Sequence, residues 1–338
     1  DNEYIKVVKK KGRIDDLPFD DIVDSNIGIG HTRWATHGKP SDKNAHPFLS
    51  CDEKIAIIHN GILENYIQIK EELKDKGHEF TSETDSEVIV HLLEEYYEND
   101  LKSAMKKTVS QLEGSFAILA MHADKREIVV ARNESPLVIG VGKGENLVAS
   151  DVPALLKHTD DVKYLRDGDI ARITSDDVEI WDFEGNEVER KTKHVEWSLK
   201  DAEKSGYEHY MLKEIHEQPR AIHESFLGRL EGFKGLDLSK YDFDSIQLIA
   251  CGTSYHACYV GKYILEKITK IPCTVEMASE YRYSAESDNY PFTILLSQSG
   301  ETADTLGATK KAKKRGCKTL AVTNVMDSSI TREVDEVI

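Results

Sequence analysis

The chain has 338 residues, more than a single hydrophobic core usually supports, and this length predicts two domains. Its 44 basic and 61 acidic residues give a net charge of −17, which argues against a nucleic-acid or anionic-membrane partner. Any phosphate ligand must therefore be held by local backbone dipoles rather than by a positively charged surface.

The sequence contains no secretory signal and no apolar run of membrane-spanning length, so we expect a cytoplasmic protein. The five cysteines are odd in number and scattered, without a CxxC pair. This usage is typical of reduced thiols and predicts neither a disulfide framework nor a zinc site.

The first half predicts short strands interrupted by helices. Apolar or β-branched runs bounded by turn residues predict strands over Ile5–Val8, Ile27–Gly30, Ile55–His59, Ser115–His122, Glu127–Ala131 and Leu137–Val141. Helical spacing of apolar residues predicts helices over Glu64–Lys74, Ser86–Tyr97 and Leu101–Leu112. Thr84 or Asp85 is expected to cap the second helix, and the β-like pattern resumes over Val162–Trp181.

The second half has a different pattern, after a charged, weakly periodic stretch that begins at Glu187 and indicates a linker. A helix is expected from Tyr210 to Gln218, interrupted at Pro219 and resuming until Gly228. Strands at Ser245–Ala250, Cys273–Glu276, Phe292–Leu296 and Thr319–Thr323 then alternate with helices, which predicts a doubly wound parallel sheet. We expect a first domain over 1–193, a linker over 194–208 and a second domain over 209–338.

Residues suited to gripping a free amino acid occur in the first half. In the segment 31–38, Arg33 can bind an α-carboxylate through two parallel hydrogen bonds, and Asp85 can hold an α-ammonium. Asn60 and Gly61 follow an apolar strand and offer a side-chain N–H and an unobstructed backbone N–H, the donors that an oxyanion hole requires. No obvious nucleophile accompanies them.

Two hydroxyl-rich loops follow strands of the second half. They are Cys251-Gly252-Thr253-Ser254 and Ser297-Gln298-Ser299-Gly300-Glu301-Thr302. Each opens a helix, where unpaired N–H groups and the helix dipole favour an anion such as a phosphate monoester. Ser and Thr also cap helices in most proteins, so this alternative stays open for each loop, although the pair together favours a site. Neither loop is a Walker A sequence, and no GxGxxG occurs.

These motifs carry a resemblance to two known families. The 251–254 and 297–302 loops resemble those of sugar isomerase (SIS) domains. The segments 31–38, 44–47, 59–61 and 83–85 resemble class II, N-terminal-nucleophile glutaminase domains, and 207–219 resembles the segment that joins such domains. The resemblance implies an α/β fold in which an Ntn-hydrolase αββα sandwich, here incomplete, precedes a doubly wound SIS domain. The combination is similar to amidotransferases that pass ammonia internally from glutamine to fructose 6-phosphate, giving glutamate and glucosamine 6-phosphate, without a cofactor.

The resemblance also implies residue roles. Glutamine would be bound by residues of the first half: Arg33, Trp34, Thr36, His37 and Asp85. Trp34 would gate the passage of ammonia, and Asn60 and Gly61 would form the oxyanion hole. The sugar phosphate would be held by residues of the two loops: Thr253, Ser254, Ser297, Gln298, Ser299 and Thr302. The family suggests a homodimer.

The nucleophile of class II glutaminases is an N-terminal cysteine whose own α-amine acts as base. Position 1 is Asp1 here, and Cys51 lies in an expected loop where the family has no catalytic residue. We therefore expect the nucleophile upstream of Asp1, and the isomerase catalytic residues and second SIS domain beyond Ile338.

Three other interpretations were weighed. A sugar-phosphate-binding regulator without catalysis would account for the missing nucleophile. A class II amidophosphoribosyltransferase is disfavoured, because its pyrophosphate-binding loop is not found. Metal binding is not assigned to the histidines at 31, 37, 46 and 59, because no carboxylate motif supports them.

Overall fold

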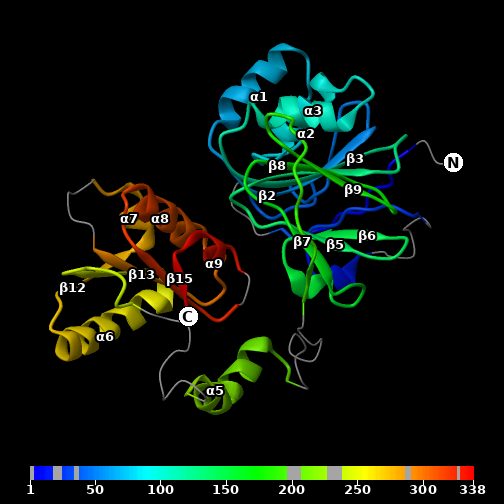
Figure 1. Cartoon of the computed structure of the whole chain (residues 1–338). Coiled ribbons are helices and arrows are strands. Elements are labelled where there is room, and N and C mark those ends of the chain that lie inside the picture. The colour runs from blue at the N-terminus through cyan, green and yellow to red at the C-terminus, as the bar shows by residue number, and fades with distance from the viewer. Residues whose placement is uncertain are drawn as a thin grey trace. The chain divides into compact units, whose positions relative to one another are not determined.

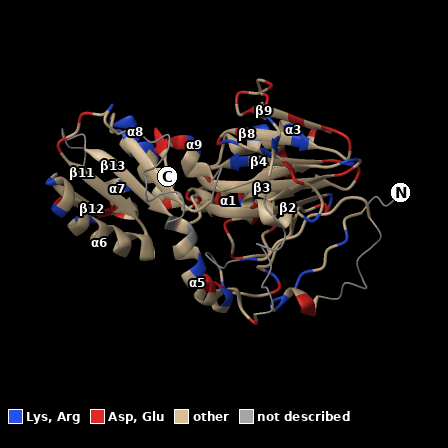
Figure 2. Cartoon of the chain, turned by 60° about the horizontal axis from the view of Figure 1, so that its bottom comes forward, with Lys and Arg blue, Asp and Glu red and all other residues tan. Residues whose placement is uncertain are grey.

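The computed structural model describes residues 4–17, 25–33, 38–195, 207–226, 238–285, 291–325 and 328–338. The chain divides into two compact units, Asp1–Glu203 and Lys204–Ile338 (Figure 1). Acidic and basic residues are present on the elements of both units (Figure 2). Among the described residues, no helix is long and apolar enough to cross a membrane.

The first unit is built on a six-stranded antiparallel sheet. Its strands, in spatial order, are β1 (Phe48–Leu49), β2 (Ile55–Leu63), β3 (Gly114–His122), β4 (Ile128–Asn133), β8 (Asp169–Ile173) and β9 (Val178–Asp182). Three helices cover one face of this sheet: α1 (Tyr66–Asp75), α2 (Glu87–Tyr96) and α3 (Leu101–Val109) (Figure 1). Ile57 of β2, Leu93 of α2 and Met105 of α3 are completely buried between these layers.

A second antiparallel sheet covers the opposite face. Its order is β10 (Lys193–His194), β7 (Asp161–Tyr164), β5 (Val138–Val141) and β6 (Asn146–Ala149). Because side chains alternate along a strand, Ile58 of β2 points away from the helices and packs with Ile139 of β5. The short 3₁₀ helix η3 (Val152–Ala154) packs on the face of this sheet that points away from the six-stranded sheet. The predicted αββα layering is confirmed, with the short helical turn η3 outside the second sheet.

The second unit contains the predicted parallel sheet, which is confirmed. The strand order is β12 (Cys273–Met277), β11 (Ile246–Ala250), β13 (Phe292–Ser297), β14 (Thr319–Thr323) and β15 (Glu336–Val337). The helix α6 (Gly252–Thr269) packs on one face. Helices on the other face are α7 (Ala278–Tyr283), α8 (Ala303–Lys314) and α9 (Ser329–Glu333). Leu248 of β11 faces the α6 side, and Ile249 is completely buried on the α8 side.

Several expected boundaries were wrong. The segments Ile5–Val8 and Ile27–Gly30 are not strands, because a short apolar run forms a strand only where a partner strand pairs with it. A short 3₁₀ helix, η1 (Ile14–Asp16), follows the first of these segments. The helix α5 (Tyr210–Phe226) is not interrupted at Pro219 but continues through it. An interior proline removes one backbone hydrogen bond, and the remaining bonds of a long helix tolerate that loss.

Candidate active site

The proposed oxyanion pair lies within β2 rather than after it, because this strand continues from Ile55 to Leu63. In the antiparallel ladder Asn60 is opposite Ala117, and Gly61 is opposite Phe116. Gly61 has a φ of +134°, and a Cβ atom there would lie 2.0 Å from the carbonyl oxygen of Ser115. Only glycine fits this position, so its backbone N–H is presented without a side chain beside it.

A hydrogen bond orients the amide of Asn60. The Nε2 atom of His31 lies 2.8 Å from Asn60 Oδ1, and the Asn60 side chain is exposed. Burial lowers the pKa of His31, so its imidazole is neutral near pH 7. With the proton on Nε2, His31 donates to Oδ1, and the Asn60 NH₂ group is then available as a donor to a ligand.

Asp85 is 3% exposed and joins the segment before α2 to the end of β2. Its Oδ2 accepts a hydrogen bond of 3.0 Å from the backbone N–H of Leu63. The expectation that Thr84 or Asp85 caps α2 was wrong: the N-cap is Ser86, and its side chain makes no capping bond. Glu87 instead accepts from the backbone N–H groups of Thr81 and Ser82, at 2.8 and 2.7 Å, and fixes this segment.

Hydrogen bonds connect the segment of Arg33 with that of Asp85. Arg33 Nη2 donates to the carbonyl of Gly38 at 3.1 Å. Asn44 Nδ2 donates to the neighbouring carbonyl of Lys39 at 2.9 Å, and Asn44 Oδ1 accepts from the backbone N–H of Glu83 at 3.0 Å. Glu83 precedes Asp85 by two residues, so the two proposed ligands of the amino acid lie on connected segments. Trp34, Thr36 and His37 lie outside the described residues.

Buried histidines pack and form hydrogen bonds around the proposed glutamine-binding residues. The rings of His31 and His46 lie 4.0 Å apart, and His59 Nδ1 is 2.9 Å from Ser86 Oγ. Burial lowers the pKa of His46 to about 2 and that of His59 to about 4. These imidazoles are therefore neutral at physiological pH and act as packing and hydrogen-bonding groups.

The two hydroxyl-rich loops lie side by side in the second unit. Ala250, at the end of β11, pairs with Leu296 near the end of β13. From β11 the chain passes through α6 to β12 on one side, and it returns through α7 to β13 on the other side. The carboxyl edge between β11 and β13 is therefore the topological switch point, where open α/β sheets bind ligands.

Internal hydrogen bonds shape the second loop. Ser297 Oγ accepts from the backbone N–H of Gly300 at 3.0 Å and lies 3.2 Å from Thr302 Oγ1. Ser299 Oγ accepts from the N–H of Glu301 at 3.2 Å. The helix N-caps, Cys251 for α6 and Thr302 for α8, make no side-chain capping bond. The hydroxyls of Ser297 and Ser299 therefore order the second loop rather than cap a helix in the usual way.

One side-chain cluster was missed from the sequence. Cys51, His78, His91 and Glu94 place a sulfur, two nitrogens and an oxygen within 4.8 Å of one another. Its members come from three segments, so no ligand spacing identified it; only His91 and Glu94, three residues apart on α2, gave a local signal.

The position of Cys51 bears on the missing nucleophile. Cys51 lies before β2 begins, whereas Asn60 lies five residues after Ile55, the first residue of β2, which is about 16 Å along an extended strand. Cys51 is therefore not placed beside the oxyanion pair.

Comparison with known proteins identifies two domains in the chain. Residues 31–157 match the family model of the glutamine amidotransferase domain, and residues 241–338 match that of the SIS domain. The class of protein is thereby defined as a glutamine amidotransferase domain followed by a SIS domain.

Individual relatives identify the family. The chain is 46% identical to a glutamine–fructose-6-phosphate aminotransferase (isomerizing) of Caldanaerobacter subterraneus, over 100% of this chain and 58% of that protein. It is 47% identical to the protein of the same name from Thermus thermophilus, over 99% of this chain and 57% of that protein. The chain thus belongs to the glutamine–fructose-6-phosphate aminotransferase family, and it spans somewhat more than half the length of these relatives.

A solved structure also matches the chain in part. It is the C-terminal domain of glucosamine-fructose-6-phosphate aminotransferase from Francisella tularensis, 43% identical over 40% of this chain and 40% of that chain, with a TM-score of 0.37.

Proposed function

We propose that the protein containing this chain is a glutamine-dependent amidotransferase. It converts fructose 6-phosphate and glutamine to glucosamine 6-phosphate and glutamate, the first step of hexosamine synthesis, with ammonia passed between two sites. The observation that carries the proposal is similarity along the whole of this chain to 57–58% of the length of proteins named for this reaction. Two sets of loops suited to its two substrates support it.

In the glutamine site, Arg33 binds the α-carboxylate and Asp85 binds the α-ammonium. The Asn60 amide and the Gly61 N–H stabilise the oxyanion that forms when the side-chain amide is attacked. The orientation of Asn60 by His31, and the absence of a Cβ at Gly61, support these roles. Trp34, Thr36 and His37 complete the loop in this proposal, with Trp34 as the ammonia gate. The attacking thiolate is assigned to an N-terminal cysteine, as in class II glutaminases, and not to Cys51.

In the sugar site, neutral donors of the two loops bind the phosphate and part of the sugar chain. The residues proposed are Thr253, Ser254, Ser297, Gln298, Ser299 and Thr302. Their position at the switch point of the sheet supports this assignment, and so do the helix N-termini behind both loops. No positive surface is needed, which suits a chain with a net charge of −17.

The proposal extends to the assembly. The outer face of α6 exposes Tyr259, Val260, Tyr263, Ile264 and Ile268, which are between 42% and 74% exposed. An apolar face of this kind usually contacts another protein surface, and we assign it to a second copy in a cytoplasmic homodimer. Light scattering should then show a dimer, and Ile264→Glu should shift it toward monomer.

The first domain is proposed to cover 1–193 and the second to begin at 209.

The reaction itself is the primary test. The whole protein should release equal amounts of glutamate and glucosamine 6-phosphate from its two substrates, and it should form the aminosugar from free ammonia as well. Fructose 6-phosphate binding without aminosugar formation from either donor would contradict the proposal and favour a sugar-phosphate-binding regulator.

The sugar site has a separate test in the 338-residue chain. Thr302→Val removes one hydroxyl with little change in shape, and we expect it to weaken fructose 6-phosphate binding about tenfold, the value of one hydrogen bond. Thr309→Val is the matched control, because Thr309 lies later on α8 and its hydroxyl donates to the carbonyl of Thr305 within the helix. Titration calorimetry measures both, and equal affinities for the two variants would remove Thr302 from the site.

A further inference from the structure

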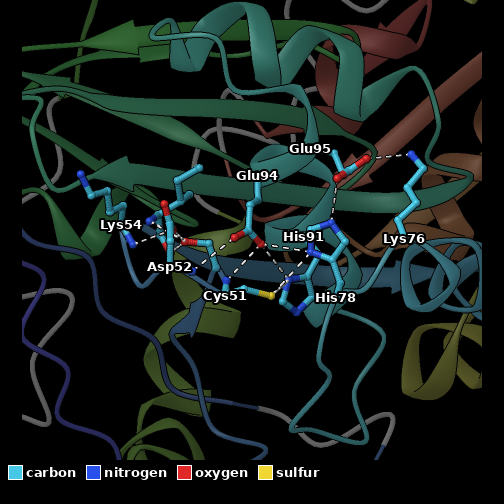
Figure 3. A network of polar contacts seen from close by, with 10 residues as sticks. Cys51, Asp52, Lys54, Lys76, His78, His91, Glu94 and Glu95 are labelled. Carbon is cyan, nitrogen blue, oxygen red and sulfur yellow. Dashed lines mark hydrogen bonds and ion pairs between the residues drawn. The ribbon is translucent and has the colours of Figure 1, made fainter.

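Four potential metal ligands, none of them used in either proposed substrate site, converge within the first unit (Figure 3). Cys51 lies in the β1–β2 connection, and His78 follows α1. His91 and Glu94 lie one turn apart on α2. Cys51 is exposed, whereas the side chains of His78, His91 and Glu94 are 8%, 2% and 19% exposed. Three of the four side chains are therefore mostly buried, and an ion could reach the cluster from solvent beside the exposed thiol of Cys51.

Four distances between the donor atoms are close to those of a tetrahedral zinc site, and all the donor atoms lie within 4.8 Å of one another. Cys51 Sγ lies 3.6 Å from the Nδ1 atoms of both His78 and His91. Glu94 Oε2 lies 3.1 Å from His78 Nδ1 and 3.3 Å from His91 Nδ1. Ideal tetrahedral bonds of about 2.3 Å to sulfur and about 2.1 Å to nitrogen or oxygen separate S and N ligands by about 3.6 Å, and N and O ligands by about 3.4 Å.

The surroundings also have the pattern of a metal site. His78 Nε2 lies 3.0 Å from Glu95 Oε1, and Glu95 in turn pairs with Lys76 at 2.8 Å. A carboxylate on the outer ring nitrogen is the usual means of orienting a metal-bound histidine. The Glu94 carboxylate accepts from the backbone N–H groups of Cys51 and Asp52, at 3.0 and 3.2 Å, which holds it toward the cluster.

The contacts of His78 leave one ring nitrogen for the cluster. Its Nε2 atom lies against Glu95 Oε1, so Nδ1 is the atom that faces Glu94 Oε2, at 3.1 Å, and Cys51 Sγ, at 3.6 Å. The sulfur, the carboxylate and the Nδ1 atoms of both histidines could all be ligands of one divalent ion.

We propose that Cys51, His78, His91 and Glu94 bind one Zn²⁺ ion in a structural site. Four protein ligands leave no open position for a substrate, and this mixed set of S, N and O donors suits zinc better than magnesium or calcium. The ion would join the β1–β2 connection, the end of α1 and the middle of α2. The segment that carries Asp85 lies between His78 and His91, so the ion would also limit its movement.

Zinc binding by the 338-residue chain tests this proposal. After chelator treatment and dialysis against Zn²⁺, mass spectrometry of the metal should find one equivalent per chain. Co²⁺ in its place should give a thiolate-to-cobalt charge-transfer band and the intense visible bands of tetrahedral cobalt. Neither readout depends on enzymatic activity.

Variants decide which residues hold the ion. Cys51→Ser and His78→Gln should weaken zinc binding by at least about 100-fold, and Glu95→Gln by about 10- to 100-fold. Matched controls outside the cluster, Cys251→Ser and His158→Gln, should keep one equivalent. Circular dichroism checks the fold of each variant, and Cys51→Ser exchanges an exposed thiol for a hydroxyl of similar size. A folded native chain that binds no more zinc than Cys51→Ser, or ligand variants that retain native affinity, would overturn the proposal.

Discussion

Buried, uncharged histidines are the most unusual residues around the proposed glutamine site. Both ring nitrogens of His46 are buried, and so is Nε2 of His59. None of these atoms has a hydrogen-bond partner among the residues that the structure describes. A charged imidazole in such surroundings would lose its hydration without compensation, so both residues remain neutral in the folded protein. Their contribution to stability therefore depends on pH.

Acidification should destabilise the first unit through these groups. The unfolded pKa of histidine is 6.5, and the folded values are about 2 for His46 and about 4 for His59. At pH values between the folded and unfolded pKa, the unfolded state binds more protons than the folded state. The stabilisation from the neutral histidines is therefore complete above pH 6.5 and decreases as the pH falls below it. Each histidine should contribute a loss of about 2 kcal/mol at pH 5. Urea unfolding of His46→Gln should show a shallower decline from pH 7 to 5 than the native chain, and an identical decline would contradict the burial argument.

Arg33 offers a second prediction at this scale. Arg33→Lys should raise the KM for glutamine about 30-fold in the whole protein, because a point charge replaces a bidentate contact worth about 2 kcal/mol. Aminosugar formation from free ammonia should survive the change. Steady-state kinetics with the two nitrogen donors separates these effects, and an equal loss of both activities would show a structural role for Arg33.

At the scale of elements, the single strand β2 carries both core residues of the first unit and the proposed oxyanion pair. Its early residues, including Ile57, are buried between sheet and helices, and its later residues carry Asn60 and Gly61. The positive φ of Gly61 lies inside a paired strand, opposite Phe116, rather than in a turn. The pairing of the end of β2 with β3 therefore depends on a residue without a side chain.

Gly61→Ala tests that dependence. Its Cβ would lie 2.0 Å from the Ser115 carbonyl oxygen at a φ of +134°, so β2 and β3 would have to separate. We expect a loss of about 3 kcal/mol in unfolding free energy, measured by urea titration. Gly28→Ala is the control, because its φ is not in the left-handed region and no described residue lies within 4 Å of its added Cβ. Similar stabilities for the two variants would refute the steric argument.

At the scale of the whole molecule, the two units have separate hydrophobic cores. Buried residues of the six-stranded and four-stranded sheets form the cores of residues 1–203, and the parallel sheet forms those of residues 204–338. A core that is complete within one unit allows that unit to unfold as its own cooperative transition.

Calorimetry of the 338-residue chain should therefore resolve two transitions. Fructose 6-phosphate at about 100 times its Kd should stabilise only the second unit, by about 2.7 kcal/mol. Gly61→Ala should lower only the transition of the first unit, which assigns the two peaks. A single transition that moves with both changes would show that the units unfold together.

The sequence alone determined the class of fold and the loops of both candidate sites. Strands such as Phe292–Leu296 are buried on both faces and appear as short apolar runs between turn residues, so local pattern is sufficient to locate them. The carboxyl-end position of the 251–254 and 297–302 loops follows from alternating strands and helices. Arg33, Asn60 and Asp85 were proposed as site residues from their chemistry.

Only the tertiary structure decided which distant residues meet. The contacts from Asn44 to Glu83 and from His31 to Asn60 join residues 39 and 29 positions apart, and sequence spacing does not encode such pairings. The Cys51–His78–His91–Glu94 cluster was missed for the same reason, since its ligands come from three segments. The path of α5 through Pro219 was decided by the summed hydrogen bonds of the helix, which outweigh the local effect of one proline. Local pattern thus determines elements, whereas side-chain sites depend on how those elements pack.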